Sequence, residues 1–110
     1  MAIVNAQINS TDTTLITVPA TKKYAITTVL VCNNQIDDGS GANDTSFDMH
    51  VIPNGQSKAN RNLILNDLKV AAADTFTFNV ERLILEADDR LVFVGANPTN
   101  LSCTVSYLEV

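Results

Sequence analysis

The feature that most constrains this chain is an alternation of apolar and polar residues with a period of two, repeated in segment after segment. It is clearest in the stretch LSCTVSYLEV, residues 101–110, whose apolar positions are Leu101, Cys103, Val105 and Tyr107. Successive side chains of a β-strand point to opposite faces of a sheet. Residues 101–110 are therefore expected to form a core strand, with Glu109 at its rim.

The same alternation recurs between clusters of turn-forming residues. Further strands are expected within residues 2–9, 14–19, 24–34, 47–53, 75–85 and 90–96. A short strand at 62–66 is favoured over a helix, because Asn62, Asn66 and Asp67 are poor residues for a helix interior. Seven or eight strands separated by turns predict one all-β domain over residues 1–110, an antiparallel β-sandwich of jelly-roll-like form.

The segment YAITTVLVCNN, residues 24–34, carries β-branched residues at both odd and even positions. A strand that is apolar on both faces is usually central, or has its second face covered by a partner. This pattern predicts an oligomer interface. Its candidate residues are Val29, Val31, Ile52 and Glu109.

Charge and hydropathy exclude two classes of partner, nucleic acids and membranes. The net charge is −5 and the seven lysines and arginines are scattered, whereas nucleic-acid binding needs a basic stripe. No apolar run approaches the ~20 residues that span a membrane, and the first residues lack the charged and apolar regions of a signal peptide. The chain is thus expected to fold in a cytoplasm, with Cys32 and Cys103 as reduced, inward-facing thiols on the third and the last strand.

Two clusters could in principle bind a metal. Asp48 and His50 share one face of a predicted strand, but a metal site usually needs three or four ligands, so a surface pair is favoured. The loop QIDDGSGANDTS offers oxygen ligands of the kind that calcium prefers. They are Asp37, Asp38, Asn43 and Asp44. Their spacing departs from that of an EF-hand, which favours a solvated turn and no metal.

A third cluster, Glu86, Asp88 and Asp89 before Arg90, offers the paired carboxylates of glycoside hydrolysis. Such enzymes also need a surface on which sugars stack. The chain has no Trp and only two tyrosines, Tyr24 and Tyr107. A turn with a local ion pair is favoured. No G-x-S-x-G motif supports a Ser-His-Asp triad, so the chain is expected to be no enzyme and to need no cofactor.

Three stretches together match a known pattern. They are TLITVPATKKYAI at 14–26, continued by TTVLVCNN; the turn LEADDRL at 85–91; and the closing VSYLEV at 105–110. Read end to end, the chain resembles small β-sandwich structural proteins from the virions of tailed bacteriophages, frequent in marine and cyanobacterial phages. One residue departs from the pattern, because Asp88 stands where that family usually has Gly. Asp tolerates left-handed backbone better than most residues, so the turn is expected to survive.

The resemblance implies a virion structural protein, assembled in the host cytoplasm, that decorates or cements the capsid. It would act as a symmetric homo-oligomer, expected to be a trimer, and would contact the major capsid protein or other virion proteins. A neck, baseplate or tail-fibre-associated protein is the alternative within the virion. A carbohydrate-binding module is the alternative of another class, and exposed aromatic side chains would distinguish it.

Overall fold

The structure, a computed structural model, describes residues 2–110, apart from the side chains of Glu81 and Arg82. Eight strands and one 3-10 helix make up this part of the chain. They are β1 (Ala2–Gln7), β2 (Thr13–Thr17), β3 (Tyr24–Asn33), β4 (Thr45–Ile52), η1 (Asn60–Asn62), β5 (Leu63–Val70), β6 (Thr75–Leu85), β7 (Arg90–Gly95) and β8 (Leu101–Glu109). All strand pairs are antiparallel. The prediction of an all-β chain is confirmed.

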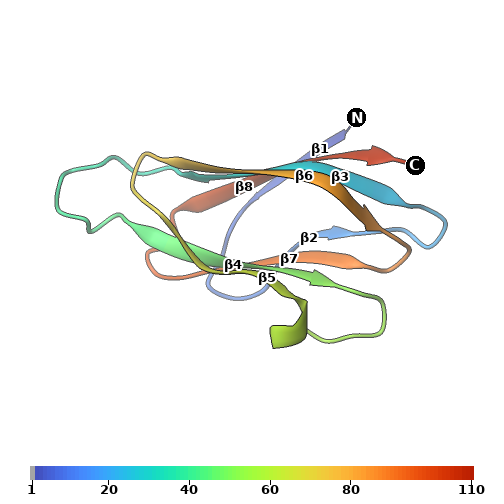
Figure 1. Cartoon of the computed structure of the whole chain (residues 1–110). Helices are drawn as coiled ribbons and strands as arrows, with labels where there is room; N and C mark the ends of the chain where they lie inside the picture. The colour runs from blue at the N-terminus through green and yellow to red at the C-terminus, as the bar shows by residue number, and fades with distance from the viewer. Residues whose placement is uncertain (1) are drawn as a thin grey trace.

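The strands form two four-stranded sheets that pack face to face (Figure 1). Sheet A has the order β1-β8-β3-β6 and sheet B the order β2-β7-β4-β5. The chain crosses from one sheet to the other at every connection except that between β4 and β5. This interleaved order of eight strands is that of a jelly roll, so the predicted fold class is confirmed.

The core lies between the sheets and takes side chains from both. Its largest members, all below 2% exposed, include Ile8, Ile26, Phe47, Met49, Leu91, Phe93 and Leu101. The Phe47 ring lies 6.1 Å from the rings of Phe76 and Phe93, which joins the two sheets through aromatic contacts. Burying a large apolar side chain contributes about 1.5–3 kcal/mol, so this layer is the main source of stability.

The last strand is a central one, as expected. β8 pairs with β1 on one side and with β3 on the other. Leu101, Cys103 and Val105 are at most 1% exposed, and the Tyr107 ring lies 4.4 Å from that of Tyr24. Glu109 lies exposed at the rim and forms a 3.3 Å ion pair with Lys22.

A β-bulge in β3 explains why its sequence looked apolar on two faces. The register shifts between Ile26 and Thr28, which leaves Thr27 as an extra residue opposite Ser106. One extra residue reverses the alternation, so Ile26, Val29 and Val31 all point into the core, each at most 1% exposed. The prediction of Val29 and Val31 as interface residues is therefore wrong, because neither reaches the surface.

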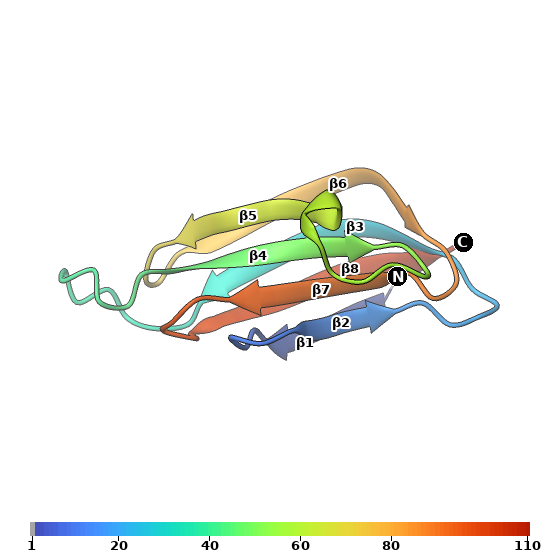
Figure 2. The same ribbon diagram turned by 90° about the horizontal axis from the view of Figure 1, so that it is seen from below.

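The outer face of sheet B is partly covered by the chain itself. The segment 53–62 runs back over the sheet, and η1 lies against this face (Figure 2). Ile52 is 0% exposed and Val92 1%, although neither belongs to the core between the sheets. Ile52 is thus no interface residue either. Asn62 lies in η1, and β5 begins one residue later and runs past the predicted end at residue 66.

Candidate functional surfaces

His50 and Asp48 serve the fold and do not form a ligand pair. His50 is 5% exposed, and its Nδ1 lies 2.8 Å from Oδ1 of the equally buried Asn62. Asp48 accepts a 2.7 Å hydrogen bond from the backbone N–H of Asp67. The predicted surface pair is wrong for His50, because segment 53–62 covers the strand face that it occupies.

Hydrogen bonds to its own carboxylates stabilise the acidic loop that precedes β4. Asp37 accepts from the N–H of Gly39, and Asp38 accepts from both the N–H and the hydroxyl of Ser40. The two hydrogen bonds from Ser40, above all the one from its hydroxyl group, lower the pKa of Asp38. Asp44 accepts from the N–H of Ala72. The carboxylates thus point to separate backbone donors, as in a solvated turn.

The carboxylates at 86–89 likewise shape a turn. Asp89 accepts 2.8 Å bonds from the N–H groups of Asn54 and Glu86, and Glu86 forms a 3.5 Å ion pair with Lys23. Arg90 donates to the carbonyl of Gln56 instead of pairing with its acidic neighbours. The predicted turn is confirmed, but the predicted local ion pair is wrong, because Glu86 pairs with Lys23, which is distant along the chain.

The two cysteines lie on neighbouring strands but on opposite faces of sheet A. Cys103 is 0% exposed, and its burial raises the pKa of the thiol to about 11. Cys32 is partly exposed and lies on the outer face, so its predicted inward orientation is wrong. The bulge at Thr27 is the cause, because it shifts every later residue of β3. Both thiols are free, and no cluster of three potential metal ligands occurs among the described side chains.

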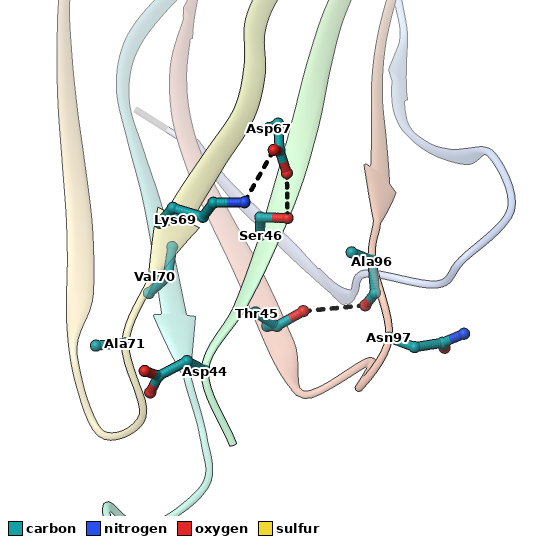
Figure 3. A pocket seen from close by; sticks show the side chains of 9 residues that line it. All are labelled: Asp44, Thr45, Ser46, Asp67, Lys69, Val70, Ala71, Ala96 and Asn97. Carbon is teal, nitrogen blue, oxygen red and sulfur yellow. Dashed lines mark hydrogen bonds and ion pairs between the residues drawn. The ribbon is translucent and has the colours of Figure 1, made fainter. Parts of the chain in front are cut away.

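A groove of about 520 Å³ opens beside the start of β4 (Figure 3). Several of its polar side chains are already paired. Asp67 accepts from the Ser46 hydroxyl at 2.5 Å and from Lys69 Nζ at 2.8 Å, and the Thr45 hydroxyl donates to the carbonyl of Ala96. Lys69 above all, and then Ser46, lower the pKa of Asp67. Within this groove Asp67 and Lys69 are therefore held together as an ion pair.

The outer face of sheet A is the most distinctive surface. Of the chain's twelve acidic and seven basic residues, only Glu81, Arg82 and Glu109 fall in its four strands. The alternation along β8 places the Glu109 side chain on the inner side of the sheet, like that of Tyr107, and Glu109 forms an ion pair with Lys22. Every outward side chain of this sheet that the structure describes is uncharged.

Small polar and aliphatic side chains fill this face. Its centre, on β3 and β8, carries Thr28, Leu30, Ser102, Thr104 and Ser106. Four of the seven exposed large hydrophobic residues in the described chain lie on it. They are Ile3 at 69%, Ile84 at 55%, Leu108 at 38% and Leu30 at 37%. These residues were not predicted from the sequence, although the scarcity of charged residues in strands far apart in the chain was a signal for them.

Aromatic side chains offer little for stacking on a sugar. Tyr24 and Tyr107 are half-buried and stack on each other, with rings 33° apart. Phe47 and Phe93 are buried, and no aromatic residue is among the large hydrophobic residues exposed in the described chain.

Comparison of the chain with known protein families, with curated proteins and with solved structures finds no significant match in any of the three. Within the described residues, no helix has the length and apolar character needed to cross a membrane.

Proposed function

We propose that this chain is a structural protein of a tailed-bacteriophage virion, which decorates or cements the capsid as a symmetric homo-oligomer. The observation that carries the proposal is an outer face on sheet A of the jelly roll whose described side chains are all uncharged, and which no other part of the chain covers. Viral capsid domains use this fold widely. Because a fold hosts many functions, the surface carries more weight than the topology.

The stretches that resemble phage virion proteins fall at positions that build the sandwich. The segment 14–26 covers most of β2, the turn after it and the start of β3, and 105–110 completes the central strand β8. At the turn LEADDRL, Asp88 adopts a φ of 65°, the left-handed region where Gly is at ease. The chain thus keeps the turn for which the family uses Gly, which supports the resemblance.

The test is to find the protein in particles. Virions of the phage that encodes this chain would be purified on a density gradient and analysed by mass spectrometry. Antibodies against the chain would then be located by electron microscopy. The proposal expects the protein in intact particles, with label spread over the head. Label confined to the neck, baseplate or fibres would support the alternative within the virion, and absence from particles despite expression in infected cells would refute both.

A further inference from the structure

We propose that the outer face of sheet A is a two-fold interface, covered by the same face of a second copy of this chain. The inference deepens the homo-oligomer part of the proposed function and names its surface. It rests on three observations, which are the charge of the face, its exposed aliphatic side chains and its extent.

Charge selects a second copy as the occupant. The chain carries a net charge of −5, so two copies repel each other when their charged surfaces meet. The outer face of sheet A is the large surface on which the described side chains bring no charge. In a two-fold interface the same patch meets itself, and the described side chains of this patch, being uncharged, meet their copies without like-charge repulsion. A basic partner would instead favour the acidic loops.

The side chains on the face are those of an interface centre, where charged residues are depleted. Leu30 lies near the middle of the sheet, paired in register with Thr104 and Thr77. Ile84 and Leu108 both pair with Ala25 and form one aliphatic row. In Figure 1 no other segment lies over this layer, whereas segment 53–62 already covers part of the opposite outer face.

The extent of the face suffices for a specific contact. Four strands about 4.8 Å apart, with about nine residues each at about 3.3 Å, present roughly 600 Å². Two copies then bury about 1,200 Å² in total, at the lower end of specific interfaces. We therefore expect a dimer that dissociates on dilution.

The experiment compares Leu30→Lys with Ile64→Lys by analytical ultracentrifugation. Ile64 is 49% exposed on β5, so both variants place the same charge on an exposed aliphatic position of a strand. Wild type and Ile64→Lys are expected to dimerise, and Leu30→Lys to stay monomeric at least tenfold above the wild-type dissociation constant. A wild type that is monomeric at about 1 mM or forms a trimer, or a Leu30→Lys dimer as strong as that of wild type, overturns the inference.

Cys32 gives a second readout that needs no variant. Its thiol lies on the outer face, two residues from Leu30, whereas Cys103 is buried in the core. Maleimide labelling of Cys32 should slow as the protein is concentrated, and Cys103 should stay unlabelled throughout in the folded protein. A Cys32 labelling rate that is independent of concentration contradicts the interface. Either result leaves the detection of the protein in virions unaffected, so the two proposals fail separately.

Discussion

Thr27 and Ser106 are joined across the β3–β8 pair by a 2.6 Å contact between their hydroxyl groups, and the Thr27 hydroxyl also donates to the Ser106 carbonyl at 3.1 Å. Thr27 is the extra residue of the bulge. These two bonds hold the bulge at one position, and the bulge decides which residues of β3 face the core.

Replacing Thr27 by Ala should therefore lower stability. Loss of the part-buried hydrogen bonds costs about 1 kcal/mol, which corresponds to a fall in melting temperature of about 4 °C in a domain of this size. Thr14→Ala, at an exposed strand position, is the control with the same chemical change. Equal melting temperatures for the two variants would show that the bulge does not need this contact.

Removing residues 105–110 should prevent folding. The deletion takes Val105, which is fully buried, Tyr107, which stacks on Tyr24, and the second half of a central strand. The lost burial amounts to several kcal/mol, comparable with the stability of a small domain. Far-UV circular dichroism would report the loss of strand structure. Removal of Val110 alone, whose side chain is 63% exposed, is the control and should leave a folded chain.

Asn62→Ala should be costly although the residue lies in a short connecting segment. The Asn62 side chain binds Nδ1 of His50, accepts from the N–H of Ala59 and donates to the carbonyl of Ser57. Its loss leaves buried polar groups unpaired, at a cost of about 1–3 kcal/mol. Denaturant unfolding would measure the loss. Asn60→Ala changes an exposed neighbour, and a cost as large for Asn60 would argue against the buried network.

Stability should fall in alkali through Cys103. Burial raises the pKa of this thiol from 9.0 to about 11, so between these values the unfolded chain has lost a proton that the folded chain keeps. The unfolded state then binds fewer protons, and the free energy of unfolding decreases as pH rises from 9 to 11. The effect is on the order of 2 kcal/mol. This loss of stability is absent at pH values well below 9.0, the pKa of the thiol in the unfolded chain.

Unfolding free energies of the wild type and of Cys103→Ala, measured across this pH range, would test the assignment. The variant should be less stable at neutral pH but should show a shallower decline above pH 9. An equal decline in both proteins would assign the alkaline loss to other groups.

The sequence predicted seven or eight strands and their approximate bounds, because period-two alternation records which face each residue occupies. It failed where one residue breaks that period. The bulge at Thr27 cannot be recognised in a run of β-branched residues, so Cys32 was assigned to the wrong face and Val29 and Val31 to an interface.

A second kind of error came from packing between segments distant along the chain. His50 and Ile52 lie on the outer face of their strand, but segment 53–62 folds back over them. The outer face of sheet A was equally hidden. Its strands come from residues 2–7, 24–33, 75–85 and 101–109, and their scarcity of charged residues becomes a property of one surface only when the strand order is known. The interface prediction for Glu109 remains a prediction.

The central place of β8 also sets the order in which the molecule can assemble on a ribosome. Once β7 has emerged, all four strands of sheet B are available, but sheet A consists only of β3 and β6, and β1 has no neighbour to pair with. The apolar side of a finished sheet B therefore waits for the last strand to be translated. Residues 101–109 then pair with β1 and β3 at once, which completes sheet A over the apolar side of sheet B.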